Sequence, residues 1–480
     1  MSKMSKKTYY IIYSIVGLVF LGTGFFAGMH HEPWADEAQA WLMAKDSNSL
    51  MELIRAVRYE GTPALWHMIV KISQIMGLSY EHFFVLPLLF STLGVVLLFC
   101  TKAPWYWKVL IPFTFYIVYQ NSVVARSYCL VFPVMMLVTL FFEKRKEEPM
   151  GFYGALVLLA LTSSYGIIVA GSFLLYECKD ILLIVFRKEY ETKKKELLGF
   201  FVGGFLVFLI GCMILPPADC MPIIGGKQRS VSEVAAMITN TFLFPMNGTV
   251  LTMVFALMLV GFFFFYCRKH IGQAMVYTLP LIGYLILMQD NIWHLTYFYV
   301  LILVLMILFH GEAEEKFFSA NECIVTALIA LQCACGVFCV GTEVKDSYSG
   351  SAQAVSFVKQ ALKQGATVSA VDYHGTALQP YFEKNIFENR PGEVRYYIWS
   401  RNNHYIDKYQ CEPEQLYEQI HSDLIVAQDF GEAKKLQFEG YRKIVFDGNM
   451  FYKFGHSDST DMAIWVKKDK FPEEKSTLEP

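Results

Sequence analysis

Long apolar runs recur through the first two thirds of the chain, and they constrain its fold more than any other feature. Hydrophobic residues make up 55% of the 480 residues, a larger share than soluble domains usually carry. About 20 consecutive apolar residues are long enough to cross a bilayer as a helix. We predict eleven such helices, at residues 9–28, 80–100, 106–123, 127–142, 151–163, 166–186, 197–215, 244–266, 272–288, 293–309 and 323–341. The sequence therefore predicts an α-helical polytopic membrane protein.

Basic links between these runs predict the orientation. Lysines precede the first run, and further basic clusters fall at 143–146, 187–195 and 268–270. Short loops rich in Lys and Arg stay in the cytoplasm, so we expect a cytoplasmic N-terminus and an extracytoplasmic C-terminus in the cell membrane. The shorter run at 62–77 is apolar on one helical face only, which indicates a helix lying in the interface and not crossing it.

The composition changes after residue 342. We assign residues 1–342 to a transmembrane catalytic domain with a first outer loop at 29–79, and residues 343–480 to a small extracytoplasmic α/β domain. The second domain is predicted because a helical pattern alternates with short buried strands. The helix is expected at 354–362 and the strands at 367–371, 424–427, 441–446 and 463–466.

Two classes of partner are not expected. The formal net charge is only -2, so no basic footprint indicates nucleic acid. The chain has no glycine-rich phosphate loop between a strand and a helix, and we therefore predict no nucleotide cofactor.

The first outer loop carries two adjacent carboxylates, Asp36 and Glu37, ahead of two short amphipathic helices that we expect to lie on the membrane. Such a pair can bind a divalent cation such as Mg²⁺ or Mn²⁺, or one member can act as a general base toward an acceptor hydroxyl. A structural role is equally open from the pair alone, because Asp36 can cap a helix and Glu37 can favour its first turn.

Other polar residues gather at the same predicted face. Arg126 begins a span there, and an arginine in that position needs an anion or a water-filled cavity. Its planar donor fork suits a lipid-linked phosphate, whereas the alternative is snorkelling to head groups. Glu60, His67, Tyr165 and His294 fall near the same level. A lone histidine is as often structural, so the convergence on one face, more than any single residue, predicts a site.

Short motifs in this region resemble a known family. Residues 33–41, Pro-Trp-Ala-Asp-Glu-Ala-Gln-Ala-Trp, are followed at 58–66 by Arg-Tyr-Glu-Gly-Thr-Pro-Ala-Leu-Trp. Together they resemble bacterial members of the GT-C glycosyltransferase superfamily, multi-spanning enzymes related to protein O-mannosyltransferases and aminoarabinose transferases. The segment at 125–128, Ala-Arg-Ser-Tyr, is similar to the family's Ala-Arg-Pro-Tyr, and Trp293-His294 stands where related chains often have Arg-His.

The chain departs from the family pattern at three positions. Thr62 stands in place of histidine, Ser127 in place of proline and Trp293 in place of arginine. These departures affect residues around the motif and leave Asp36, Glu37 and Arg126 unchanged.

The resemblance implies an inverting transfer of a sugar from a polyprenyl-phosphate donor to a glycan, lipid or protein acceptor. The donor phosphate would lie near Arg126, and Asp36 would deprotonate the acceptor hydroxyl as it attacks the anomeric carbon. Glu37, or a metal ion held with it by the Asp36–Glu37 pair, would neutralise phosphate charge. The predicted substrate-binding residues are Arg126, Tyr128, Glu60, His67, Tyr165 and His294.

Two other classes compete with this interpretation. A transporter or flippase of lipid-linked glycans would use the same charged groups along a pathway, and it predicts inverted repeats and polar residues at mid-membrane depth. A membrane anchor for a carbohydrate-binding C-terminal domain would leave the acidic pair and the many spans unexplained.

Overall fold

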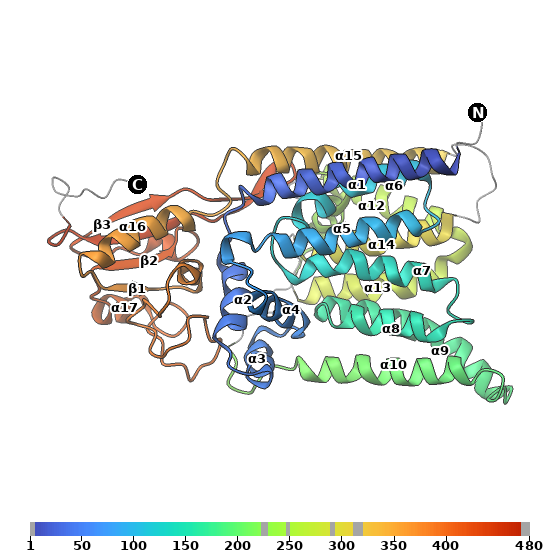
Figure 1. Cartoon of the computed structure of the whole chain (residues 1–480), viewed down its shortest axis with the longest axis horizontal. Helices are drawn as coiled ribbons and strands as arrows, with labels where there is room; N and C mark the ends of the chain where they lie inside the picture. Colours follow the sequence, from blue (N-terminus) through green and yellow to red (C-terminus); the bar gives the residue numbers. More distant parts are fainter. Residues whose placement is uncertain (1–4, 222–228, 246–249, 289–292, 311–319, 472–480) are drawn as a thin grey trace.

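The first part of the chain forms a bundle of helices along one axis, and a smaller domain covers one end of that bundle (Figure 1). The computed structural model describes residues 5–221, 229–245, 250–288, 293–310 and 320–471. We name the covered end, where α1 ends at Gly28 and α15 ends at Glu343, the capped end; α1 and α15 begin at the open end. The long bundle helices are α1 (Lys6–Gly28), α5 (Val85–Cys100), α7 (Val131–Phe142), α8 (Pro149–Ala160), α9 (Ser164–Phe186), α10 (Lys194–Met213), α12 (Val250–Tyr266), α13 (Ile271–Leu287), α14 (Leu295–His310) and α15 (Ala320–Glu343).

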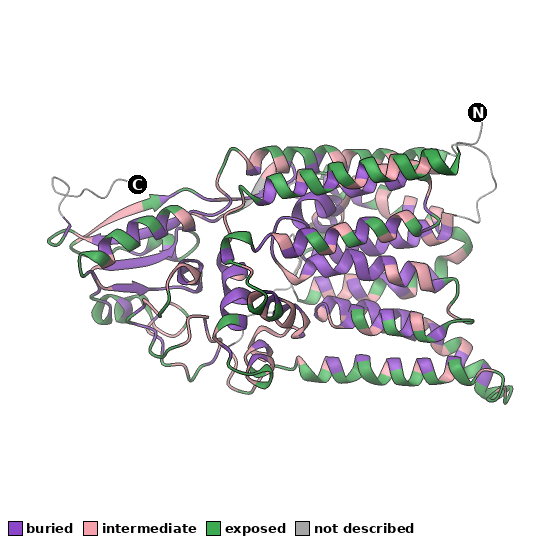
Figure 2. Cartoon of the chain, in the orientation of Figure 1, coloured by how far each residue is buried: buried purple, intermediate pink, exposed green. Residues whose placement is uncertain are grey.

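The outer surface of the bundle is apolar. Exposed positions colour the outward faces of the peripheral helices in Figure 2, and they include Leu18 on α1, Phe208 on α10 and Leu257 on α12, each more than 60% exposed. By length and composition, five of the described segments can cross a membrane: Lys6–Gly28, Tyr80–Cys100, Lys194–Met213, Arg268–Leu287 and Ala320–Glu343. Four shorter apolar helices accompany them. Large apolar surfaces of this kind are stable in lipid and not in water. The protein is a multi-pass membrane protein, as predicted.

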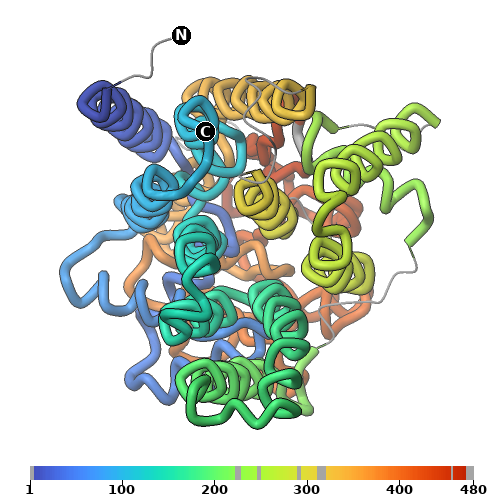
Figure 3. The backbone as a smooth tube through the Cα atoms, turned by 90° about the vertical axis from the view of Figure 1, so that its right-hand side faces the viewer, coloured from blue at the N-terminus to red at the C-terminus, as the bar shows by residue number. Residues whose placement is uncertain are grey.

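Helix α14 lies at the centre of the bundle. Figure 3 looks along the bundle from its open end and shows this helix, in yellow, surrounded by the others. Nearly every side chain of α14 is buried, from Leu295 to Phe309. A helix that is apolar on all sides belongs in a core, and the central position of α14 in Figure 3 agrees with its apolar sequence.

One predicted span is not a regular helix. We expected a single helix over 106–123, and the structure instead has α6 (Trp105–Leu110), the 3₁₀ turn η3 (Ile111–Phe113) and the π-helix η4 (Phe115–Gln120). Pro112 interrupts the α-helical pattern because it has no N–H to donate. Irregular backbone at membrane depth is tolerated where protein surrounds it, and every residue of η4 is buried. The broken segment delivers the chain to Arg126, whose backbone is extended.

The predicted span at 244–266 also differs. Helix α12 begins at Val250, and a separate helix, α11 (Val231–Phe242), occupies a region that we expected to be an outer loop. Ser230 and Glu233 form a capping box that starts α11, a signal that the sequence carries and our prediction overlooked.

The first loop contains α2 (Ala35–Asp46), α3 (Leu50–Val57), the 3₁₀ turn η1 (Arg58–Glu60) and α4 (Leu65–Ile75). Helix α4 has 11 residues, fewer than a span requires. It buries Trp66 and Val70 and exposes Ile75 and Met76, which are 78% and 81% exposed. A helix with one packed side and one exposed apolar side fits the interfacial position that we predicted for 62–77.

Helix α2 does not lie on the membrane surface, contrary to our expectation. Nine of its residues are buried, from Ala35 to Ala44. It packs against α4 on one side and against the 3₁₀ segment η7 (Tyr373–Tyr381) of the C-terminal domain on another. The amphipathic pattern was misleading because the C-terminal domain covers the face that we assigned to water.

The C-terminal region forms the small α/β domain that we predicted, a four-stranded sheet whose two faces are covered by helices, although only the helix on one face was predicted. The strand order is β1 (Val368–Ala370), β2 (Leu424–Gln428), β6 (Met462–Lys467) and β3 (Tyr441–Phe446). Strands β1 and β2 are parallel, and the other two pairings are antiparallel. Helix α16 (Ser351–Lys363) packs on one face and α17 (Pro413–Gln419) on the other.

A hairpin of this domain reaches into the bundle. Strands β4 (Asn449–Tyr452) and β5 (Gly455–Ser459) form it, and Lys453 stands at its tip with a φ of 53°. The buried Lys453 ammonium donates to the carbonyls of Asn240, Thr241 and Leu243 at the end of α11. Cations are favourable at helix C-termini, so the hairpin fastens the domain to the bundle.

Candidate active site

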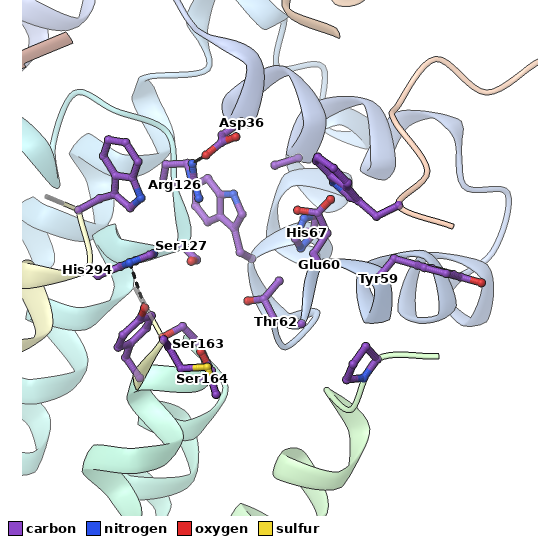
Figure 4. A pocket seen from close by; sticks show the side chains of 18 of the residues that line it. Asp36, Tyr59, Glu60, Thr62, His67, Arg126, Ser127, Ser163, Ser164 and His294 are labelled. Carbon is purple, nitrogen blue, oxygen red and sulfur yellow. Dashed lines mark hydrogen bonds and ion pairs between the residues drawn. The ribbon is translucent and has the colours of Figure 1, made fainter. Parts of the chain in front are cut away.

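A cavity of about 510 Å³ lies at the capped end, between the first loop, the bundle and the C-terminal domain. Seven of the eight predicted site residues line it: Asp36, Glu60, His67, Arg126, Tyr128, Tyr165 and His294. The close-up in Figure 4 shows Asp36 between two walls. One wall comes from the bundle and carries Arg126, Ser127 and His294, and the other comes from the first loop and carries Tyr59, Glu60 and His67.

Asp36 and Arg126 form an ion pair at the top of this cavity. Asp36 stands in the first turn of α2, whereas Arg126 follows the π-helix, so helix packing brings the two together across the chain. Both side chains stay partly open, at 23% and 22% exposure. The guanidinium carbon lies 5.8 Å from the ring centroid of Trp34 and 5.4 Å from that of Tyr128. These aromatic faces stabilise the cation and aim it into the cavity.

The C-terminal domain contributes directly to the site. The Tyr373 hydroxyl donates to Asp36 Oδ1 at 2.9 Å, and Trp399 lines the cavity. Burial raises the pKa of Tyr373 well above its ordinary value, so the hydroxyl keeps its proton and remains a donor. Gln39 also holds the C-terminal domain against α2, because its side-chain amide exchanges two hydrogen bonds with the main chain of Tyr397, at 2.7 and 2.8 Å. We did not predict these residues.

The bundle wall presents donors suited to an anion. Helix α9 begins at the cavity, and Ser163 caps it by accepting from Gly166 N–H at 3.3 Å. The N-terminus of a helix of 23 residues carries a partial positive charge. The Tyr165 hydroxyl and His294 Nδ1 lie 3.0 Å apart, and their rings stack with centroids 4.6 Å apart. Arg126 and this helix end therefore face one space.

The first-loop wall carries polar groups that protein partners leave open. Among the described residues, His67 Nδ1 and Trp66 Nε1 are buried without a hydrogen-bond partner. Burial lowers the pKa of His67 to about 4, so its ring is neutral at physiological pH. Burial raises the pKa of Glu60, which accepts from Gln39 Nε2 at 2.9 Å. A buried polar atom without a partner is costly, so His67 Nδ1 and Trp66 Nε1 are available to a ligand.

Glu37 is the predicted site residue that does not line the cavity. Its side chain is fully buried, and it accepts from the backbone N–H groups of Trp34 at 3.1 Å and Ala125 at 2.6 Å. His31 Nε2 lies 3.0 Å from Glu37 Oε2, the oxygen that also accepts from Trp34. Of the two structural roles that we considered, helix capping thus belongs to Glu37, since Asp36 stands inside the first turn and Trp34 is the N-cap.

The carboxylates of Asp36 and Glu37 do not fit a shared metal site. Asp36 pairs with Arg126, and Glu37 is occupied by main-chain donors and His31. Within the described ranges, no group of three or more His, Cys, Asp or Glu side chains gathers in a way that could hold a metal ion. We therefore derive no chemical step through a metal.

The helical bundle, its first loop and the appended C-terminal domain together form a fold that a solved structure shares over nearly the whole of this chain. Among solved structures, the chain is similar to ArnT from Cupriavidus metallidurans, crystallised with undecaprenyl phosphate bound. The TM-score is 0.53 and the sequence identity 10%, over 99% of this chain and 100% of that one. No protein-family model matches the chain, and no curated protein matches it by sequence. The resemblance predicted from residues 33–41 is confirmed at the level of the fold.

Proposed function

We propose that the protein is a membrane glycosyltransferase that moves a sugar from a polyprenyl-phosphate donor to an acceptor on the extracytoplasmic face. The observation that carries the proposal is the Asp36–Arg126 ion pair in a cavity at the capped end of the bundle. A carboxylate and a guanidinium in one cavity supply a base and a phosphate-binding group.

The basic links support the proposed orientation. The clusters at 143–146, 187–195 and 268–270 all connect helices at the open end. Because such links remain in the cytoplasm, the open end would face inward. The capped end, with the cavity and the C-terminal domain, would then face out, where lipid-linked donors and not nucleotide sugars serve as substrates.

A lipid tail has a place beside the cavity. An apolar groove of about 530 Å³ runs between α9, α10 and α13, lined among others by Ile167, Ile168, Phe208 and Leu215. It begins close to the cavity along the chain, because Ile167 follows the cavity-lining Tyr165 by two residues and Leu215 precedes the cavity-lining Pro216. A donor with its prenyl chain in this groove would bring its phosphate to Arg126 and the N-terminus of α9. ArnT, which shares the fold, was crystallised with undecaprenyl phosphate bound.

The proposed reaction uses Asp36 as the general base. A bound donor phosphate would take over the Arg126 guanidinium, which frees the Asp36 carboxylate. Asp36 would then accept the proton of the acceptor hydroxyl as its oxygen attacks the anomeric carbon. The bond from that carbon to the phosphate oxygen breaks, and the polyprenyl phosphate leaves. The negative charge that it gains is stabilised by the Arg126 guanidinium. Attack opposite to the leaving group inverts the anomeric centre.

The first-loop wall would bind the transferred sugar. His67 Nδ1 and Trp66 Nε1, which are buried without a partner among the described residues, would bond to sugar hydroxyl groups, and the Glu60 carboxylate beside them lines the same cavity. Trp399 adds an aromatic surface of the kind on which sugar rings pack.

The test compares wild-type protein with Asp36→Asn in proteoliposomes supplied with polyprenyl-phosphate sugars and candidate acceptors. Loss of a general base lowers kcat by about 100-fold or more, while Glu52→Gln, a half-buried acid of the same loop that does not line the cavity, keeps the wild-type rate. Undiminished transfer by Asp36→Asn overturns the assignment of the base. Movement of the lipid-linked sugar across the membrane without transfer would instead support the transporter alternative.

A further inference from the structure

Behind the cavity wall lies a buried chain of charged groups that the proposed reaction does not use. The His31 ring sits between two carboxylates, with Nε2 3.0 Å from Glu37 and Nδ1 3.0 Å from Glu343. The His31 side chain is 2% exposed, and the two glutamates are fully buried. A neutral imidazole donates through one nitrogen only, so two acceptors require the doubly protonated ring.

The chain is held at both ends. The Tyr119 hydroxyl of the π-helix donates to Glu343 Oε2 at the end of α15. At the other end, Glu37 accepts from the backbone N–H groups of Trp34 and Ala125. We name His31, Glu37 and Glu343 the buried clamp. It joins the first loop, the last bundle helix and the segment that leads to Arg126.

The position of the clamp matters because of its neighbours in the sequence. Asp36 directly precedes Glu37, and Arg126 directly follows Ala125. The hydrogen bond of 2.6 Å from Ala125 N–H to Glu37 Oε1 therefore sets where both members of the ion pair stand. Glu37 cannot do this alone, because a carboxylate buried in an apolar core needs a counter-charge, which His31 supplies.

We propose that His31 and Glu343 are positioning residues that act through Glu37 to hold Asp36 and Arg126 in register for transfer. This inference rests on the proposed function for its kinetic consequence and on the hydrogen bonds alone for its structural one. Glu37 is then a positioning residue too, which explains why a carboxylate adjacent to the base faces away from the cavity.

The kinetic experiment measures kcat and donor KM for His31→Gln, Glu343→Gln and the double variant. His31→Gln leaves two buried carboxylates without their counter-charge, and Glu343→Gln leaves the imidazolium with one carboxylate in place of two. We expect kcat per folded molecule to fall by about 10- to 100-fold in each single variant. In the double variant, the glutamine at position 343 can bond to the glutamine at position 31, and the latter can donate to Glu37. We therefore expect it to recover at least several-fold over His31→Gln. A residue that supports folding only would change the yield of folded protein and not kcat.

Hydrogen–deuterium exchange tests the clamp without any transfer assay. In His31→Gln we expect faster exchange in peptides covering residues 121–126, where the Ala125 amide lies, whereas His30→Gln, an exposed neighbour, leaves both exchange and kcat unchanged. Unchanged exchange and kcat in both clamp variants overturn the inference. A wild-type protein that transfers no sugar overturns the proposed function, and the exchange result then decides the clamp by itself.

Discussion

The charge on His31 predicts how the stability of the protein depends on pH. Burial by itself lowers the pKa of His31, but Glu37 and Glu343 outweigh it and raise the pKa from 6.5 to about 10. The folded protein therefore holds this proton more tightly than the unfolded chain. The resulting stability is fully present below pH 6.5 and is lost progressively as the pH rises toward 10. A shift of about 3.5 pH units corresponds to about 5 kcal/mol.

The assay compares the unfolding free energies of the wild type and His31→Gln in mixed micelles, followed by tryptophan fluorescence from pH 7.5 to 10. This window avoids Glu32, whose pKa burial raises to about 7. The wild type should lose about 3 kcal/mol more than the variant across it, because 2.5 pH units at about 1.4 kcal/mol each give about 3.5 kcal/mol and the slope falls off near pH 10, where half of the rings have lost the proton.

Subtraction of the two curves removes other groups that titrate at high pH, because both proteins contain them. His30→Gln serves as the control and should follow the wild type, since the His30 ring is exposed and its Nδ1 lies 2.8 Å from the carbonyl oxygen of Phe26 in its own helix turn. Parallel curves for the wild type and His31→Gln would refute the reasoning, because they would mean that no imidazolium lies between the two glutamates.

Three further outcomes follow from the structure. Tyr373→Phe removes a donor to Asp36 and should lower kcat by about tenfold, since a hydrogen bond to a charged group is worth about 1.5 kcal/mol or more; an unchanged kcat would show that the C-terminal domain does not tune the base. Gly336→Ala places a Cβ 2.4 Å from the Phe113 carbonyl and should cost about 1–3 kcal/mol of stability. Gly341→Ala, which meets nothing within 4 Å, should cost none, and similar melting of the two variants would contradict this packing. Transfer should survive a chelator such as EDTA, because Arg126 supplies the positive charge; inactivation reversed by Mg²⁺ or Mn²⁺ would contradict it.

The gathering of Asp36, Arg126 and His294 in one cavity could be predicted from the sequence. Basic links fix the direction in which each apolar run crosses the membrane, so the polar residues at the run ends sort onto two faces without any knowledge of helix packing. The same reasoning placed Glu60 and His67 near the site, because the run at 62–77 is too short and too one-sided to span.

The different fates of Asp36 and Glu37 could not be predicted from their adjacency. Successive residues on an α-helix point about 100° apart, so only one of two neighbouring carboxylates faces a given cavity. Which one does so depends on how α2 is rotated, and its rotation is set by contacts with the C-terminal domain more than 300 residues away in sequence.

Tyr373 and Trp399 lay beyond prediction for a related reason. No periodicity marks them, since they stand in a 3₁₀ segment and in a loop of a polar domain. Their role arises from docking of that domain on the bundle. The π-helix at Phe115–Gln120 was missed because hydropathy reports how apolar a segment is and not which hydrogen-bonding pattern its backbone adopts.

The hairpin of β4 and β5 has a consequence for the order of assembly. Lys453, at its tip, stands 210 residues after Leu243, yet it completes the end of α11 and packs beside the rings of Phe115 and Tyr116. These partners are synthesised long before the hairpin exists. The carbonyl groups at the end of α11 therefore lack this cation until β4 and β5 have been synthesised, and this end of the bundle closes only after that point. A chain that stops before Asn449 would lack the ammonium that pairs with these carbonyls.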